Sequence, residues 1–191
     1  MKKSILTEKD YNSFYKGALY GKIDDPLKAA IRIAYKDLCR TIRGFSKNIK
    51  HDEIFINATK IIYHEVSLLL SKDICSQDEF EIWHKKCCDD LIKAFETQEF
   101  YYGQAQKWIN MCLKYLSMLE HSLVENQYEY FHVPIDNYIV NITGIKLSVA
   151  WSRLNDYNEY LNFQKNFRTL YSGIPLDNEF KMWLKAARYI E

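Results

Sequence analysis

Two polar residues, far apart in the chain, have side chains that could do chemistry together. Lys107 lies in FYYGQAQKWINMCLKYL, residues 100–116, and Asp136 lies in FHVPIDNYIV, residues 131–140. A partly desolvated lysine amine can act as a nucleophile, and a carboxylate beside it can exchange protons with it. The pair therefore predicts a site of amine chemistry, provided that the two segments meet in a sheltered hollow.

The helix that carries Lys107 has two different faces. At roughly 100° per residue, Lys107 falls opposite the apolar stripe of this helix. This pattern predicts that Lys107 faces outward, and the simplest interpretation is a solvated surface lysine. The apolar face holds Ala105, Trp108, Ile109, Cys112, Leu116 and Leu119, and the polar face holds Lys107, Asn110, Lys114 and Ser117.

Asp136 also has a simple structural interpretation. It closely follows Pro134 and precedes a short apolar helix, where a carboxylate can cap free backbone N–H groups. The two interpretations predict different surroundings. A capping aspartate and a solvated lysine need only open solvent, whereas a catalytic pair needs a concave pocket.

The elements that position these residues are predicted to be helices. Only 3 Pro and 6 Gly interrupt 191 residues, and apolar residues recur at three- and four-residue spacing almost throughout. We therefore expect an all-α protein of about seven or eight helices in an orthogonal bundle. The length allows one core or two small helical lobes, so we expect a single helical domain over residues 1–191, with any lobe boundary in the non-periodic loop 122–134.

Several helix ends have clear sequence signals. Asp25 is a candidate N-cap with Pro26 at the first helical position, and Gly21 is placed to end the preceding helix. Ser76 and Glu79 form the S-x-x-E pattern of a capping box. A helix is also predicted to begin near residue 153 and to close at Gly173.

The segments around Lys107 and Asp136 resemble the helix-hairpin-helix DNA glycosylase superfamily. In bifunctional members, a G-x-G-like hairpin turn leads into a helix with a nucleophilic Lys, an Asn three positions later and a Leu three beyond, and a later segment carries an Asp before an apolar helical turn. The resemblance covers roughly residues 100–145, and Ala105 stands where the family has its second glycine. The matching residues are Gly103, Ala105, Lys107, Asn110, Leu113 and Asp136.

The resemblance implies a fold, a partner and an activity. Family members are all-α and often have two lobes around a DNA-binding groove, where a flipped damaged base enters a pocket. By resemblance, Lys107 would attack the sugar C1′ and form a Schiff base, and Asp136 would assist departure of the base. DNA would be the partner, no cofactor is implied, and the DNA backbone would be positioned by Gln106, Asn110 and Lys114.

A second hypothesis belongs to a different class of function. The chain has 15 Tyr and 10 Phe, and its formal net charge is only +1. This composition fits a non-catalytic helical protein that binds a partner protein or nucleic acid through aromatic-rich faces. Complex formation that survives loss of Lys107 and Asp136 would distinguish it from the enzyme.

The remaining composition sets the expected environment. The sequence has no apolar run long enough for a membrane span or a signal peptide, so we expect a cytoplasmic protein without membrane association. Five irregularly spaced cysteines indicate reduced thiols rather than a disulfide framework. HKKCC, residues 84–88, places His84 near Cys87 and Cys88, but a zinc site needs about four ligands, and we expect no metal.

Overall fold

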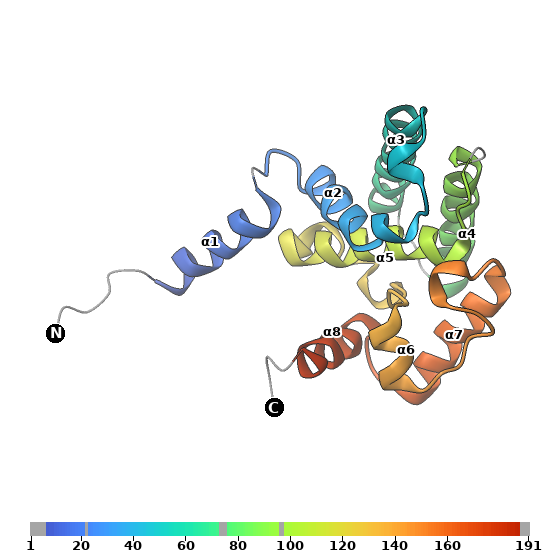
Figure 1. Cartoon of the computed structure of the whole chain (residues 1–191). Helices are drawn as coiled ribbons and strands as arrows, with labels where there is room; N and C mark the ends of the chain where they lie inside the picture. The colour runs from blue at the N-terminus through green and yellow to red at the C-terminus, as the bar shows by residue number, and fades with distance from the viewer. Residues whose placement is uncertain (1–6, 22, 73–75, 96–97, 188–191) are drawn as a thin grey trace.

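The computed structural model describes residues 7–21, 23–72, 76–95 and 98–187. Within these ranges the chain forms eight α-helices and no β-strand (Figure 1), so the predicted all-α class is confirmed. The helices are α1 (Glu8–Tyr20), α2 (Pro26–Leu38), α3 (His51–Ser71), α4 (Gln77–Ala94), α5 (Tyr102–Leu119), α6 (Asn137–Thr143), α7 (Tyr157–Leu170) and α8 (Pro175–Ala186).

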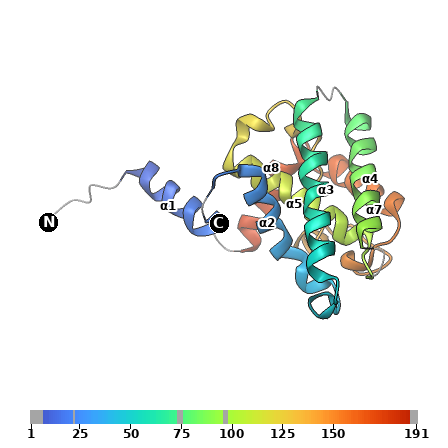
Figure 2. The same ribbon diagram turned by 90° about the horizontal axis from the view of Figure 1, so that it is seen from above.

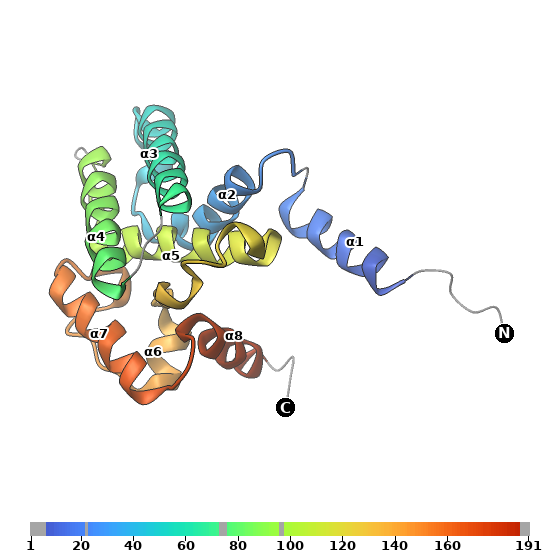
Figure 3. The ribbon, with the colours of Figure 1, turned by 180° about the vertical axis from the view of Figure 1, so that it is seen from behind.

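Helix α5 lies at the centre of the molecule. Helices α2, α3 and α4 lie on one side of it and α6, α7 and α8 on the other, in both the front and the back views (Figures 1 and 3). Helix α1 projects away from the other helices, as the view from above also shows (Figure 2). Both long faces of α5 are therefore covered by other parts of the chain.

The apolar face of α5 packs against α2. Ala30 and Ala34 on α2 are fully buried and small, which lets the two helices lie close together. Trp108 fills the interface and donates its indole N–H to the carbonyl oxygen of Ile31, with Nε1 and O 3.1 Å apart. A buried tryptophan with its one polar group bonded fixes α5 against α2.

Aromatic side chains pack together where α4 ends and α5 begins. The Phe95 ring stacks on Phe100 with ring centroids 4.0 Å apart, and it lies 5.1 Å from the ring of Phe45. These residues follow α4, precede α5 and start a short turn after α2, respectively. Their contact packs the end of α4 against the start of α5.

Two of the predicted helix starts and one predicted helix end are confirmed. Asp25 caps α2 by accepting the N–H of Lys28 at 3.1 Å, with Pro26 as the first helical residue. Ser76 caps α4 by accepting the N–H of Glu79 at 3.2 Å. Gly21 ends α1 with a φ of +69°, a backbone conformation that favours glycine.

Helix α7 begins later than the sequence pattern predicts. Residues Trp151–Arg153 form a 3₁₀-helix, η5, and α7 starts at Tyr157 because Asp156 caps it by accepting the N–H of Asn158. The helix also ends at Leu170, before Gly173, whose φ of +89° lies in the turn that leads to α8. Asp156 is thus the local signal that outweighs the apolar periodicity.

The stretch between α5 and α6 forms no α-helix, as predicted for residues 122–134. It contains two 3₁₀-helices, η3 (His121–Leu123) and η4 (Tyr128–Tyr130), and then runs extended to Asp136. Its buried residues include Phe131, Val133 and Ile135. In the described part of the chain, no helix is both long and apolar enough to cross a bilayer.

Candidate functional site

Lys107 points toward the C-terminal half of the chain and is buried. Only 6% of its side chain is exposed, so the prediction that it faces solvent is wrong. Asn110 and Lys114 on the same side of α5 are also buried, and Ser117 is partly buried. The helical pattern identified the apolar face correctly, but the polar face is covered by the segments that follow α5.

Asp136 uses its two carboxylate oxygens for two different partners. Oδ1 accepts the backbone N–H of Ile139 at 3.0 Å, so Asp136 is the N-cap of α6 as predicted. Oδ2 accepts a hydrogen bond from Lys107 Nζ at 2.8 Å, although the residues are 29 positions apart. The Asp136 side chain is 19% exposed. The two quoted segments therefore meet, and their charged groups form a largely buried ion pair.

Gln106 and Asn110 hold the segment before Asp136 on α5. Gln106 Nε2 donates to the carbonyl oxygens of Gly103 at 2.8 Å and Ile135 at 3.0 Å, and its Oε1 accepts the N–H of Ile135 at 3.2 Å. Asn110 Nδ2 donates to Gln106 Oε1 at 3.0 Å. The glycosylase resemblance assigns both residues to nucleic-acid binding. In this structure their polar groups bond within the chain and fix the approach of Asp136 to Lys107.

Lys114 forms a second ion pair on the same face of α5. Its Nζ donates to Glu179 Oε1 at 2.9 Å and Oε2 at 2.6 Å, and both side chains are almost fully buried. Burial raises the pKa of the Glu179 carboxyl, and the charge of Lys114 opposes this rise. Lys114, the third residue assigned to nucleic-acid binding, is thus occupied by a carboxylate from α8.

The start of α5 is closed to an external ligand. The resemblance implies a glycine turn whose backbone N–H groups approach a DNA phosphate. Here the N–H of Gly103 donates to the carbonyl oxygen of Leu154 at 2.9 Å, and the carbonyl of Trp151 lies against its Cα. Gly103 therefore makes room for η5 rather than for a phosphate.

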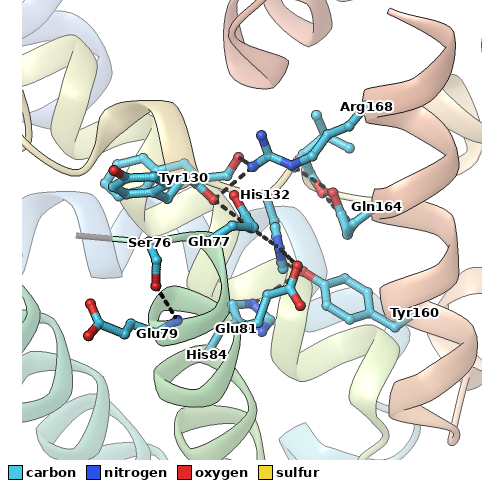
Figure 4. Close-up of polar contacts among 12 residues, drawn as sticks. Ser76, Gln77, Glu79, Glu81, His84, Tyr130, His132, Tyr160, Gln164 and Arg168 are labelled. Carbon is cyan, nitrogen blue, oxygen red and sulfur yellow. Dashed lines mark hydrogen bonds and ion pairs between the residues drawn. The ribbon is translucent and has the colours of Figure 1, made fainter. Parts of the chain in front are cut away.

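A buried polar network behind the ion pair was not predicted. Tyr160 Oη lies 2.7 Å from His132 Nδ1 and 3.3 Å from His84 Nε2, and Asn110 Nδ2 donates to it at 3.0 Å. The imidazoles of His84 and His132 and the Tyr160 hydroxyl point toward one another from α4, the extended loop and α7 (Figure 4). Tyr157 adds a hydrogen bond of 3.0 Å to His84 Nδ1.

Burial keeps the histidines of this network neutral. It lowers the pKa of His84 well below its usual value, and the nearby His132 lowers it further. It also lowers the pKa of His132, which Arg168 lowers further. A neutral imidazole offers one donor and one acceptor, which suits a fixed hydrogen-bond network. Of these two histidines, only His84 has a sequence pattern that predicts burial, because it lies on the apolar stripe of α4.

The surface side of the network anchors the extended loop on α7. Gln164 donates to the carbonyl oxygen of Val133 at 2.9 Å and accepts its N–H at 3.0 Å. The Arg168 guanidinium donates to the carbonyl oxygens of Tyr130 at 2.9 Å and Phe131 at 3.2 Å. Figure 4 shows both α7 side chains reaching the loop. These bonds replace the regular hydrogen bonds that an extended loop lacks.

The His84–Cys88 stretch is part of the core. His84 is bonded to Tyr157 and, through Nε2, to Asn110 Oδ1 at 3.1 Å. Cys87 and Cys88 are fully buried free thiols whose pKa values burial raises. Cys75, one of the five predicted thiols, lies outside the described residues. Among the described residues, no group of three or more His, Cys, Asp or Glu has the arrangement of a metal site.

A surface hollow of about 590 Å³ lies elsewhere, on α3 and α4. Its wall does not include Lys107 or Asp136, so it does not supply the concave pocket that a catalytic pair requires. Three lysines contribute to it together with one acidic residue. The lining residues are Lys50, Glu53, Ile54, Ile56, Asn57, Lys60, Lys93 and Ala94.

Comparisons with protein-family models, with curated proteins and with solved structures found no significant match to this chain. The geometry of the residues is therefore the basis for any functional proposal.

Proposed function

We propose that this protein is a DNA-repair-like glycosylase or lyase, in which the Lys107 amine attacks the sugar C1′ of a damaged nucleotide and Asp136 is its proton-transfer partner. The proposal rests on one observation. Lys107 Nζ and Asp136 Oδ2 are 2.8 Å apart, and they belong to the two segments that resemble the helix-hairpin-helix glycosylases.

The chemistry follows from the two groups. Asp136 takes a proton from the Lys107 ammonium, which frees the nitrogen lone pair. The amine attacks the C1′ aldehyde of an abasic sugar, the carbinolamine loses water, and an iminium links Lys107 to the sugar. When the damaged base is still attached, the Lys107 nitrogen forms a bond to C1′ as the bond from C1′ to the base breaks. The base leaves with the bonding electrons and with the proton that Asp136 took from Lys107. Asp136 stabilises the positive charge that develops on the sugar.

The surroundings of the pair favour a fixed geometry. Gln106 bonds both the N–H and the C=O of Ile135, the residue directly before Asp136. Asp136 is also fixed by its cap on α6. Reacting groups held in one arrangement need less reorganisation during the reaction.

Borohydride trapping tests the proposal directly. A panel of duplexes with an abasic site or an oxidised base is incubated with the protein and borohydride, which reduces the iminium to a stable amine. We expect a covalent protein–DNA adduct. Lys107→Ala should abolish it, and Lys146→Ala, at an exposed lysine, should leave it unchanged. No adduct across the panel, or undiminished trapping in Lys107→Ala, refutes the proposal.

A second variant guards against loss of folding. Lys107→Arg retains a cation opposite Asp136, but a guanidinium forms no Schiff base with an aldehyde under these conditions. We expect a folded protein with the circular dichroism spectrum of the wild type and no adduct. An adduct in this variant assigns the chemistry to another amine and refutes the role of Lys107.

A second candidate function is a non-catalytic helical protein that binds a partner through aromatic side chains, and helix α1 favours it. Of its 13 residues only Tyr20 is buried. Tyr11, Phe14 and Tyr15 are 45%, 70% and 64% exposed on a helix that projects from the body (Figure 2), and such an apolar face is typical of an interaction surface. Under this function, Phe14→Ser would abolish a complex that survives Lys107→Ala. A complex that both variants leave intact would contradict it.

A further inference from the structure

Two lysines on one face of α5 each meet a carboxylate from the C-terminal half. Lys107 and Lys114 are seven residues apart, which places them about 20° apart around the helix axis. Lys107 Nζ donates to Asp136 and Lys114 Nζ to Glu179, at distances of 2.8 and 2.6 Å. Each of the two lysine charges on this face of α5 is thus neutralised by a carboxylate of the same chain.

Helix α8 meets α5 through the second of these pairs. Of its 12 residues only Pro175, Leu176 and Glu179 are buried. The Phe180 and Trp183 rings lie over Lys114, with Nζ 4.8 and 5.8 Å from their centroids. Three side chains of α8 therefore converge on one ammonium group. The buried Leu176 and a hydrogen bond of 2.8 Å from Tyr128 Oη to Asp177 Oδ1 also hold the helix.

Docking of α8 buries charge at a cost. Removing a carboxylate and an ammonium from water costs free energy, and the attraction between the two charges offsets this cost only in part. The raised pKa of Glu179 reflects the same desolvation. A helix whose docking carries this cost is the kind of element that opens locally. The turn before it contains Gly173 at a φ of +89°, where a change of backbone direction is easily accommodated.

The location of α8 relates it to the candidate site. It packs against α6, the helix that Asp136 caps, and the two helices lie side by side in Figures 1 and 3. Glu179 pairs with Lys114, which lies seven residues from Lys107 on the same face of α5. With α8 docked, Lys107 is only 6% exposed, so a nucleotide sugar needs a movement of the chain to reach it.

We propose that α8 is an autoinhibitory cover, and that Glu179 occupies the position on Lys114 that a DNA phosphate takes when α8 moves away. A carboxylate and a phosphate oxygen offer the same negative acceptors to an ammonium group. The inference rests on the proposed function for the choice of DNA as the competing anion. Displacement of α8 frees Lys114 for the backbone, seven residues from Lys107 on the same face of α5.

Hydrogen exchange on the full chain measures the displacement. The probe is a duplex oligonucleotide with a tetrahydrofuran abasic-site analogue, which has no aldehyde and therefore cannot form a Schiff base. We expect faster amide exchange in α8 when this duplex is added, while exchange in α2 stays constant. Unchanged or slower exchange in α8 at saturating duplex overturns the proposal.

Charge variants test the competition. Glu179→Gln removes the internal anion and should bind the duplex roughly tenfold more tightly, because a larger fraction of the protein is open. The matched control Glu125→Gln removes the same charge at an exposed position and should bind as the wild type does. The double variant Glu179→Gln, Lys114→Gln should lose the gain in duplex affinity. The slope of its log affinity against log salt concentration should be smaller by about the value for one phosphate contact. Equal binding by Glu179→Gln and Glu125→Gln overturns the proposal.

The outcomes separate the cover from the catalysis. Tighter duplex binding by Glu179→Gln without any borohydride adduct supports the cover and refutes the lyase. An adduct formed by the wild type with no change in α8 exchange supports the lyase and refutes the cover. Exchange in α8 of the free Glu179→Gln variant checks that the substitution releases this helix and leaves α2 folded.

Discussion

The backbone carbonyl of Trp151 lies against the Cα of Gly103, in the space where any other side chain would begin. A methyl group there would overlap the Trp151 oxygen, and Leu154 lies beside it. Gly103→Ala must push η5 away from α5 and weaken the hydrogen bond from Gly103 to Leu154. We expect a loss of about 3 kcal/mol in the free energy of unfolding, measured by urea denaturation.

Gly17→Ala is the matched control for this prediction. Gly17 is also inside a helix, α1, but nothing lies within 4 Å of a Cβ built there. Alanine is a better helix former than glycine by up to about 1 kcal/mol, so Gly17→Ala should be neutral or slightly stabilising. Equal effects of the two substitutions would show that helix propensity, not the contact with Trp151, explains the glycine.

Neutralising Asp136 and neutralising Lys107 should lower the free energy of unfolding by different amounts. Asp136→Asn keeps a good helix cap but offers one acceptor where Asp136 uses two, and it leaves the buried Lys107 ammonium without a counter-charge. We expect a loss of roughly 3 kcal/mol. Lys107→Met leaves a carboxylate that still accepts the Ile139 N–H and is 19% exposed, so the loss should be about 1–2 kcal/mol.

Urea unfolding followed by far-ultraviolet circular dichroism measures both losses. The double variant Lys107→Met, Asp136→Asn should be more stable than Asp136→Asn alone, because the uncompensated ammonium is gone. A double variant as unstable as the sum of the single losses would show that the two side chains do not interact in solution.

The helices could be predicted because their signals are local. Asp25, Ser76 and Asp136 each accept the backbone N–H of the third residue of the helix that follows, and such caps are visible in sequence. Apolar spacing then gave the helix interiors. Asp156 is a local signal of the same kind, but the apolar spacing before it predicts an earlier start for α7.

The surroundings of α5 could not be predicted in the same way. A helical projection separates apolar from polar faces, but it does not show whether a polar face is covered. Lys107 and Lys114 became buried because Asp136 and Glu179, from distant segments, neutralise them. This pairing is a tertiary contact with no local signal.

The sequence does indicate the burial of one polar residue, His84. His84 follows Phe80 by four residues and precedes Cys87 by three, so it lies on the apolar stripe of α4. Its neighbours on the stripe predict burial, and a buried imidazole needs partners for both nitrogens. The identity of those partners, Asn110 and Tyr157, depends on the packing of α5 and α7.

The cysteines should differ in reactivity. Cys39 is partly exposed, whereas Cys87, Cys88 and Cys112 are buried and burial raises the pKa of each thiol. In a Cys75→Ser background, a thiol reagent such as dithionitrobenzoate should label one cysteine quickly in native buffer. Adding Cys39→Ser should remove this fast phase. Rapid labelling of a buried thiol would show that α4 or α5 opens under native conditions.

Stability should fall with acidification because of His84 and His132. Their pKa values are lower in the folded chain than the ordinary 6.5, so below about pH 6.5 the unfolded chain binds protons that the folded chain does not. Their contribution is therefore complete above this pH and is lost as the pH falls. The Glu179 carboxyl has the opposite effect on the pH dependence of stability. Its raised pKa favours proton uptake by the folded chain from about pH 4.5 upward.

The variant His84→Gln distinguishes the effect of the histidines on stability at acid pH from that of the Glu179 carboxyl. We expect the thermal midpoint of the wild type to decrease from pH 7.5 to pH 5.5, by several degrees for each kcal/mol lost. His84→Gln removes one titrating group and keeps a donor for Asn110 Oδ1, so its midpoint should start lower and decrease less over the same range. A parallel decrease in the wild type and in His84→Gln would assign the acid sensitivity to groups outside this network.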